Sequence, residues 1–479
     1  VHLQVKIGGD AALMHGLLKY CISTGAIDNK FIQEYSAGFS QMCTNLENTT
    51  WERIEEDSGL VREEIERAGE MFADSKAVIA CWAMGLTQHR NGVAVIQEVT
   101  NLLLLGGHIG RAGAGLCPVR GHSNVQGDRT MGIWESPSEE FLLRMDAGTG
   151  IISPRSHGYD VVGNIRAMRD GLIDTFVCMG GNFLSATPDT ELTASSLAKV
   201  GLTVQISTKL NRSHLLTGKS ALILPCLGRT ELDIANGKKQ FVSVENSMSV
   251  VHTSRGSLQP ASSMLRSESW IVCSLAMRTL PSGHCVNWLE HSINNDSTRD
   301  LIAKSIAGFE NFNQRVRVPS GFTLPNPPRD SRTFMTENGK ANFISNPLPD
   351  MNLKEDHYVM MTIRSHDQYN TTIYGLHDRY RGIHGNRRVI LMNAQDMSDR
   401  GWKTRTRVNV TSHFKGSTRA ANNWQLVPYD MPRGNIATYF PEANPLVHLD
   451  STAELSNTPT SKWIICTLES LNPPSSEEE

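Results

Sequence analysis

Residues 175–182 read Thr-Phe-Val-Cys-Met-Gly-Gly-Asn, an apolar run that ends in two glycines and an amide. Short apolar runs that end in polar or glycine-bearing loops recur at residues 203–206 and 221–224. Such runs are typical of strands buried on both faces. Because strand and helix patterns alternate, the order predicts a parallel sheet with helices on its faces. In sheets of this kind, ligands bind beyond the carboxyl ends of the strands.

Two segments nearer the start of the chain carry apolar residues at helical spacing. The first covers residues 13–21, and we expect Asp10 to cap that helix. The second covers residues 61–72, with Ser58 as the expected cap. Residues 77–81 then read Ala-Val-Ile-Ala-Cys, which predicts a short buried strand. The N-terminal part is therefore also predicted to be α/β.

A glycine-rich stretch at residues 106–115 invites comparison with a dinucleotide-binding fingerprint. It follows a predicted helix at residues 93–105, whereas that fingerprint requires a preceding strand. We therefore interpret it as a loop between two elements.

The pattern changes after about residue 315, where several prolines, asparagines and aspartates form a linker-like tract. Beyond it, strands are predicted at residues 358–363, 388–392, 407–411, 435–439 and 463–468. A strand-rich pattern with few helical stripes predicts a β domain, and we expect a barrel. The predicted organisation is thus αβα dinucleotide-binding-like domains at 1–122 and 123–235, a connecting domain and linker at 236–350, a C-terminal β-barrel domain at 351–470 and an acidic tail at 471–479.

Composition excludes several classes of protein. The 479 residues include 46 basic and 49 acidic side chains, a net charge of −3, which argues against a nucleic-acid-binding polycation. No apolar run approaches the ~20 residues of a membrane span. The nine cysteines are scattered and form no C-x-x-C pair. This usage is typical of free thiols in a reducing compartment and favours a cytoplasmic location.

Four polar, glycine-bearing segments each lie where a strand is expected to end: residues 82–88, 118–127, 179–183 and 364–372. Glycines let a backbone approach a ligand closely, and amides and hydroxyls supply paired donors and acceptors for a purine or pterin edge. Each segment alone is explained by an ordinary loop. The four together favour a large dinucleotide-type ligand, and we expect them to converge on one cleft.

These segments carry a resemblance to a known family. Residues 83–88 (Ala-Met-Gly-Leu-Thr-Gln), 104–110 (Leu-Leu-Gly-Gly-His-Ile-Gly) and 118–127 (Pro-Val-Arg-Gly-His-Ser-Asn-Val-Gln-Gly) resemble the alpha subunits of molybdenum-dependent formate dehydrogenases. Residues 334–343, 439–444 and 456–462 resemble the family's later motifs. The chain up to about residue 469 is similar to the formate-dehydrogenase-like molybdopterin oxidoreductases of the dimethyl-sulfoxide-reductase family.

The resemblance implies a cofactor of two molybdopterin guanine dinucleotides that hold one molybdenum through dithiolene sulfurs, which are soft ligands suited to a redox metal. By position, the implied cofactor-binding residues are Met84 and Gln88 in the first αβα domain; Gly180, Gly181, Asn182, Ser207 and Thr208 at a guanosine end; and Arg364, Ser365, His366, Asp367, Gln368, Asn370, Thr371, Asn444 and Lys462 in the β domain. No protein ligand of the metal is assigned.

Arg120 is the residue that the resemblance places beside the metal. A fixed cation there can orient a formate-sized anion and stabilise charge that develops during the reaction. The alternative is a structural ion pair. His122 is a candidate proton relay at neutral pH. The family pattern has Gln at that position, and a polar loop contact is the alternative.

The expected function is the catalytic subunit of a formate-dehydrogenase-like molybdenum oxidoreductase, which oxidises formate or a similar small anion by two electrons and passes them to an electron-transfer partner. The alternatives are an oxyanion reductase of the same fold and a non-catalytic scaffold. Family members carry a region upstream of the first residue of this chain, which supplies any 4Fe-4S cluster and the side chain that binds molybdenum. We therefore expect an N-terminally truncated chain, although a separate upstream polypeptide is the other explanation.

Overall fold

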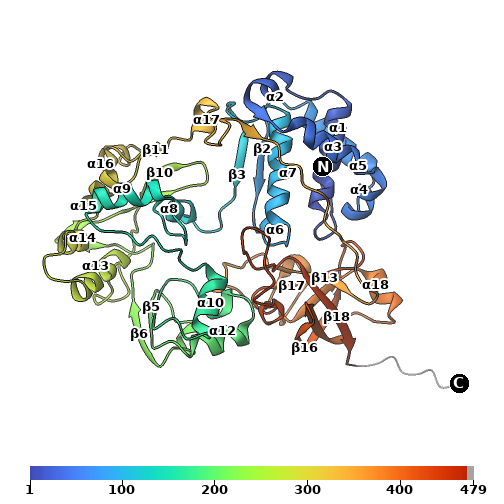
Figure 1. The fold of residues 1–479 in the computed structure, drawn as a ribbon. Coiled ribbons are helices and arrows are strands. Elements are labelled where there is room, and N and C mark those ends of the chain that lie inside the picture. Colours follow the sequence, from blue (N-terminus) through green and yellow to red (C-terminus); the bar gives the residue numbers. More distant parts are fainter. Residues whose placement is uncertain (472–479) are drawn as a thin grey trace. The chain divides into compact units, whose positions relative to one another are not determined.

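The computed structural model describes residues 1–471, so the predicted acidic tail from residue 472 lies outside the described residues. The chain folds into two compact units, each built from separate stretches of sequence (Figure 1). The first unit comprises Val1–Cys117, Leu184–Ala194 and the residues from Pro327 onward, and the second comprises Pro118–Phe183 and Ser195–Asn326. Neighbours within one unit therefore come from distant parts of the sequence.

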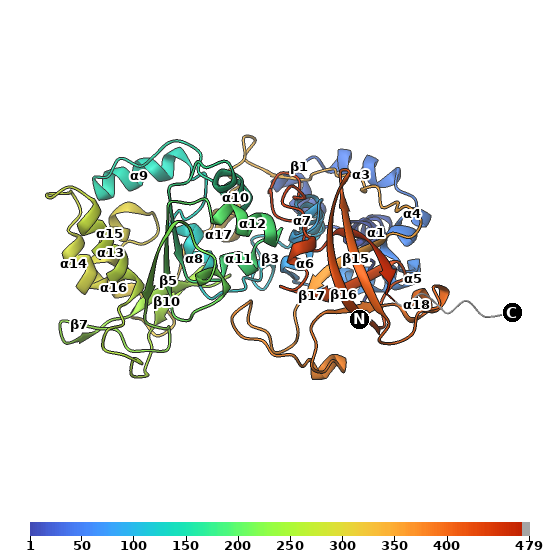
Figure 2. The same ribbon diagram turned by 90° about the horizontal axis from the view of Figure 1, so that it is seen from below.

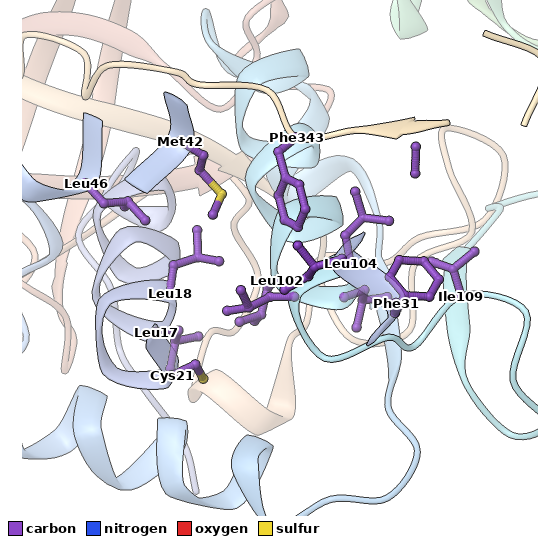
Figure 3. Packing of buried hydrophobic residues seen from close by; sticks show 14 of the residues in the cluster. Leu17, Leu18, Cys21, Phe31, Met42, Leu46, Leu102, Leu104, Ile109 and Phe343 are labelled. Carbon is purple, nitrogen blue, oxygen red and sulfur yellow. The ribbon is translucent and has the colours of Figure 1, made fainter. Parts of the chain in front are cut away.

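Helices dominate the N-terminal part of the first unit. They are α1 (Asp10–Ser23), α2 (Asn29–Tyr35), α3 (Phe39–Glu47), α4 (Trp51–Ser58), α5 (Arg62–Ala73), α6 (Met84–Thr87) and α7 (Gly92–Leu105), with strands β1 (Ser36–Ala37), β2 (Ile79–Trp82) and β3 (Gly115–Pro118). Leu18 of α1, Met42 of α3 and Leu104 of α7 belong to one buried cluster, which also contains Phe343 (Figure 3). Phe343 lies in the tract that composition marks as linker-like, so part of that tract is core.

Backbone hydrogen bonds also attach the linker-like tract to the N-terminal part of the first unit. Its elements are α17 (Pro327–Ser331) and β12 (Ala341–Asn342). Strand β12 pairs in parallel with β1, and the Phe343 N–H donates to the Ala37 carbonyl at 2.8 Å. Apolar burial and strand pairing thus fix a segment whose prolines suggested a free linker.

Both predicted helix caps are wrong, by one residue for α1 and by three residues for α5. Asp10 is the first residue of α1, whose N-cap is Gly9, and the Gly9 carbonyl accepts the first helical hydrogen bond. Ser58 is the last residue of α4, and α5 is capped at Val61, whose N–H donates to Glu64 at 3.3 Å. A cap lies outside its helix. Helix α1 therefore begins one residue earlier, and helix α5 three residues later, than the predicted caps imply.

The second unit contains the predicted parallel sheet. Its elements are α8 (Val125–Thr130), α9 (Glu139–Thr149), α10 (Val161–Arg169), β4 (Thr175–Met179), β5 (Leu202–Ser207), η1 (Arg212–His214), β6 (Ser220–Pro225), β7 (Ile234–Ala235), β8 (Lys238–Lys239), β9 (Val242–Glu245), β10 (Val250–Ser254), α13 (Glu268–Thr279), α14 (Trp288–Ile293), α15 (Asn295–Ser305), α16 (Phe312–Arg315) and β11 (Phe322–Thr323), while α11 (Phe183–Ala186) and α12 (Thr190–Leu197) cross the unit boundaries. Strand β5 pairs in parallel with β4 and β6. Phe176 of β4 packs with Met168 of α10 and Leu197 of α12, which lie beside the sheet (Figure 1).

A closed six-stranded barrel follows in the first unit. Its strands are β13 (Tyr358–Ile363), β14 (Val389–Met392), β15 (Arg407–Phe414), β16 (Ser417–Pro428), β17 (Asn435–Tyr439) and β18 (Ile464–Ser470), joined in the order β13-β17-β14-β16-β15-β18, with η2 (Arg379–Arg381), α18 (Ala394–Asp399) and η3 (Asn444–Leu446) in the connections. Figure 2 shows β15, β16 and β17 in orange and red. The expected C-terminal β domain is confirmed. Strand β16 was not predicted, because Arg419, Asn422 and Asn423 interrupt any apolar alternation.

The predicted strands at 175–179, 203–206 and 221–224 correspond to β4, β5 and β6. Their predicted burial on both faces is right for β5 only, since Val177 of β4 and Leu222 of β6 are about half exposed. Within residues 1–471, no helix combines the length and the apolar character needed to cross a membrane.

Candidate functional site

One end of the barrel gathers polar segments from three parts of the sequence. The parallel strands β13 and β17 end there together and continue into residues 364–372 and 440–446. Because β18 is antiparallel to β13, its beginning lies at the same end, where the Thr362 N–H donates to the Ser461 carbonyl at 3.0 Å. The predicted residues from Arg364 to Thr371, with Asn444 and Lys462, are therefore brought into one region of the first unit.

Arg387 fixes the segment after β13. Its guanidinium is 4% exposed, and Nε donates to Glu442 Oε1 at 2.8 Å. Nη1 donates to Ser365 Oγ at 2.9 Å, and Nη2 donates to Gln368 Oε1 at 2.9 Å and to the Phe440 carbonyl at 2.8 Å. Ser365 and Gln368, both implied cofactor ligands, thus use these side-chain atoms to hold the loop. Arg387 is therefore a buried structural cation and not a solvated one.

A second buried charge, the Asp378 carboxylate, lies in the same segment. Its side chain is 1% exposed and accepts from Tyr439 Oη at 2.7 Å, from Arg381 Nη1 at 2.7 Å and from His366 Nδ1 at 2.9 Å. Burial alone would raise the pKa of this carboxyl, but the hydrogen bonds from Tyr439, His366 and Arg381 outweigh it and lower the pKa to about 2. Asp378 therefore orients the more exposed His366 ring. Neither Asp378 nor Arg387 lies within a run of apolar residues in the sequence. The sequence pattern therefore gives no sign that these two charged side chains are buried.

Lys462 connects this end of the barrel to the segment after β2. Its N–H donates to the Gln88 carbonyl at 3.0 Å, and its ammonium donates to the carbonyl and hydroxyl of Thr362. Gln88 Nε2 in turn approaches Met84 Sδ at 3.6 Å. Burial lowers the pKa of Lys462 to about 8, and repulsion from Arg364 acts in the same direction. The predicted residues Met84, Gln88 and Lys462 thus lie close together.

Asn370 has an unused acceptor. Its Oδ1 is buried and has no hydrogen-bond partner within residues 1–471, and its φ of 46° is left-handed. A buried amide oxygen without a partner is costly, so a ligand donor such as a pterin or purine amine would fit it. Asn444 differs, because its Nδ2 donates to the Ser185 carbonyl at 2.6 Å and so holds residues 184–194. Residues around the β13 end therefore fit a heterocyclic ligand.

The other predicted residues of this segment differ in exposure. His366 and Asp367 are exposed, Arg364 is partly exposed and Thr371 is buried. The Arg364 guanidinium lies over the Phe440 ring, 5.8 Å from its centroid. Arg364 thus adds a second cation to the region that holds Lys462.

In the second unit, a cavity of about 660 Å³ lies beyond the carboxyl ends of the parallel strands. Gly180 after β4, Thr208 after β5 and Gly228 after β6 line it, together with Asn124 of the predicted segment 118–127. Gly180 and Gly181 have φ of 68° and 69° and open space where a Cβ would be. Such glycines let a ligand approach the backbone.

Two further predicted residues stand at these strand ends without lining the cavity. Asn182 Oδ1 accepts from Ser213 Oγ at 2.9 Å, and Ser207 Oγ donates to the Lys209 carbonyl at 2.8 Å. Their side chains brace the loops after β4 and β5. Strand-end topology thus groups all five predicted guanosine-end residues, although only Gly180 and Thr208 border the cavity.

Arg120 also belongs to the second unit. Its Nε and Nη2 donate to Gln126 Oε1 at 3.2 and 3.1 Å, and the side chain is exposed. Within the described part of the chain, no carboxylate lies at ion-pair distance from it, which argues against a structural ion pair. His122, two residues on, is exposed. Burial raises the pKa of the nearby Asp128 carboxyl, and the charges of Arg129 and then His122 act in the opposite direction.

Comparison with known proteins gives the family of the barrel. Residues 358–465 match the Molydopterin dinucleotide binding domain. This range runs from the first residue of β13 into β18, so the matched segment and the barrel coincide.

The chain is also similar to individual proteins, over almost its whole length or over a part of it. It is 50% identical over 478 residues to an uncharacterized oxidoreductase of Mycobacterium tuberculosis, which covers 98% of this chain and 61% of that protein. It is 34% identical over 132 residues to formate dehydrogenase H of Escherichia coli, 28% of this chain and 18% of that protein. The structure of acetylene hydratase from Pelobacter acetylenicus matches 97% of this chain and 70% of that chain with a TM-score of 0.62 and 14% identity, a likeness of fold alone. Residues 358–465 thus match a molybdopterin dinucleotide-binding domain, and nearly the whole chain is similar to a protein described as an oxidoreductase.

Replacing Arg387 with Met should destabilise the first unit. Removing one partner of a buried ion pair leaves the Glu442 carboxylate without the guanidinium that donates to it, at a cost of about 3–5 kcal/mol. The adjacent Arg388 is exposed, and Arg388→Met should change stability by no more than about 0.5 kcal/mol. Chemical denaturation of both variants measures the difference. Equal effects would show that the Arg387 network does not hold the segment.

Asp378 should make stability depend on acid pH. Its folded pKa of about 2 lies below the ordinary unfolded value of about 3.9, so its contribution is present above that value and is lost as the pH falls toward 2. The expected loss between about pH 5 and pH 2 is about 2 kcal/mol greater in the wild-type chain than in Asp378→Asn. Denaturation curves over this range test it, and parallel curves for the two proteins would contradict it.

Proposed function

We propose that this chain forms the cofactor-holding, catalytic part of a molybdenum oxidoreductase that oxidises formate or a similar small anion. The coarser assignment, a molybdopterin-dependent oxidoreductase, is what the sequence similarities support. The observation that carries the cofactor-holding part of the proposal is the coincidence of the matched range 358–465 with a barrel end that contains a buried amide oxygen on Asn370 without a partner in residues 1–471. The chain spans 61% of the length of its Mycobacterium relative, so the activity of the whole protein is part of the proposal.

The cofactor is proposed to be a bis(molybdopterin guanine dinucleotide), which would supply the two-electron redox chemistry when bound. In the first unit, Asn370 would accept from a heterocyclic amine, while Arg364 and Lys462 would face phosphate oxygens with positive charge. Met84 and Gln88, which lie next to Lys462, would also contact the cofactor there. In the second unit, Gly180 and Thr208 at the 660 Å³ cavity would receive a guanosine end, with Gly181, Asn182 and Ser207 shaping the loops.

Arg120 would bind and orient the substrate anion. Within residues 1–471, Gln126 is the one side chain to which its guanidinium donates, which leaves donors for a carboxylate. His122, two residues away and exposed, would accept or return a proton at neutral pH. The partial match to formate dehydrogenase H supports formate as the first anion to test. All nine cysteines are free thiols, which supports a reducing compartment for this chemistry.

The decisive experiment measures molybdenum and pterin in the purified holoprotein and then formate-driven reduction of a viologen dye. Stoichiometric molybdenum with formate turnover supports the proposal. The protein could instead contain molybdenum and turn over only when an oxyanion is the substrate and reduced dye is the electron donor. That result would favour a reductase. Absence of molybdenum from protein expressed in a cofactor-competent host would contradict cofactor binding and favour a scaffold.

Asn370→Gly should weaken cofactor retention. Glycine keeps the left-handed backbone without strain and removes only the amide. Loss of one ligand hydrogen bond lowers affinity by about tenfold, so the pterin content should fall after dialysis. Asn423 is the matched control, because it is an exposed asparagine with a φ of 63° in the same barrel. Equal pterin content in Asn370→Gly and Asn423→Gly would contradict the contact.

Arg120→Ala should separate turnover from cofactor binding. Removing a preorganised cation that stabilises developing charge should lower formate turnover by about 10²–10³-fold, with unchanged molybdenum content. Arg144 is the control, since it is an exposed arginine of the same unit whose nearest carboxylate, that of Glu140, is 3.6 Å away. Arg144→Ala should retain activity. Parallel loss of molybdenum and activity in Arg120→Ala would indicate a structural role for Arg120.

A further inference from the structure

Two cysteines lie opposite each other in the short sheet of the first unit. Strands β2 and β3 are paired there (Figure 1), and the Gly115 N–H donates to the Val78 carbonyl at 3.0 Å. This bond joins the first residue of β3 to the residue just before β2, so the two strands start together and run in parallel. In a parallel ladder, such a bond makes Ile79 the partner of Gly115. Two residues further along each strand, Cys81 is therefore the partner of Cys117.

Strand pairing brings the two thiol groups into contact. Neighbouring strands lie about 4.8 Å apart, and partner residues of a ladder direct their side chains to the same face. Burial raises the pKa of the Cys117 thiol, and Cys81, which forms a hydrogen bond with it, raises that pKa further. A disulfide requires Cα atoms about 4.4–6.8 Å apart. The sheet thus holds both cysteines at a spacing at which a disulfide can close without movement of the backbone.

The two cysteines differ in their access to solvent. Cys81 is exposed, whereas Cys117 is partly buried. An oxidant in solution therefore reaches the Cys81 sulfur first, and the Cys117 thiol is placed to react with whatever forms on it. This combination of an accessible thiol and an adjacent second thiol is typical of cysteines that respond to oxidants.

We propose that Cys81 and Cys117 are a redox modification site and form a reversible disulfide when the protein meets a peroxide. The Cys81 thiol loses its proton and attacks one oxygen of hydrogen peroxide, which breaks the O–O bond, releases water and leaves a sulfenic acid. The Cys117 sulfur then attacks the Cys81 sulfur, loses its own proton and displaces a second water. Two electrons pass from the sulfurs to the peroxide. A thiol reductant such as glutathione restores both thiols by disulfide exchange.

The disulfide would restrain two segments that carry candidate ligand-binding residues. Cys81 lies three residues before Met84, and Cys117 lies three residues before Arg120. Because β2 and β3 run in parallel, a covalent bond between Cys81 and Cys117 ties the start of segment 82–88 to the start of segment 118–127. The bond depends on strand pairing alone and needs neither the cofactor nor the substrate.

The test treats the 479-residue chain with hydrogen peroxide and counts its thiols after denaturation. The count should fall from nine by two, and peptide mapping should find a Cys81–Cys117 link that dithiothreitol reverses. Cys81→Ser should form no intramolecular disulfide. Cys285→Ser is the matched control, since it removes an exposed cysteine of the second unit, and it should still lose two thiols. A persistent sulfenic acid on Cys81 beside a reduced Cys117, or a link between other cysteines, overturns the proposal.

Hydrogen exchange measures the restraint on the two segments. Backbone amides of residues 82–88 and 118–127 should exchange several-fold more slowly in the oxidised chain than in the reduced chain. Peroxide should produce no such difference in Cys81→Ser. Equal exchange in the oxidised and reduced wild-type chain would contradict the restraint. Molybdenum content and formate turnover are measured on separate samples of reduced protein, so failure of the proposed function would leave the disulfide result unchanged.

Discussion

The buried guanidinium of Arg387 is the constraint on which the candidate site of the first unit depends. Removing a cation from water costs several kcal/mol, and this is offset only if its donors are satisfied with good geometry. Here Glu442 supplies the countercharge, and Ser365, Gln368 and the Phe440 carbonyl accept the remaining donors. Since these partners come from both segments at the barrel end, one side chain sets their relative position. The segment is therefore held as a unit rather than as an ordinary flexible loop.

Asp378 complements this arrangement with a buried anion. The hydrogen bonds from Tyr439, Arg381 and His366 stabilise the ionised form of its carboxyl. The bond to His366 also fixes the orientation of that ring. Holding the backbone with buried charges leaves other side chains of the segment for a ligand. Asn370 is the clearest case, because its buried amide oxygen has no partner within the described residues.

Chain topology supplies the rest of the site. Parallel β13 and β17 bring segments about 70 residues apart in sequence to one barrel end, where Gln368 Nε2 donates to the Phe440 carbonyl across a separation of 72 residues. In the second unit, the ends of β4, β5 and β6 surround the 660 Å³ cavity by the same geometry. Both units therefore place polar residues at strand ends, where ligands of α/β and β proteins commonly bind.

The sequence by itself determined the strands β4, β5, β6, β13, β14, β15, β17 and β18 and the polar segments at their ends, because short apolar runs and glycine-bearing loops are local signals. It also indicated the family of the barrel, since the motifs are contiguous. Tertiary structure alone decided which polar residues brace the loops and which remain available, as Ser365 and Asn370 illustrate. It also decided that Phe343 is core and that Val177 is half exposed. Burial and hydrogen-bond partners depend on residues distant in the sequence, and no local pattern encodes them.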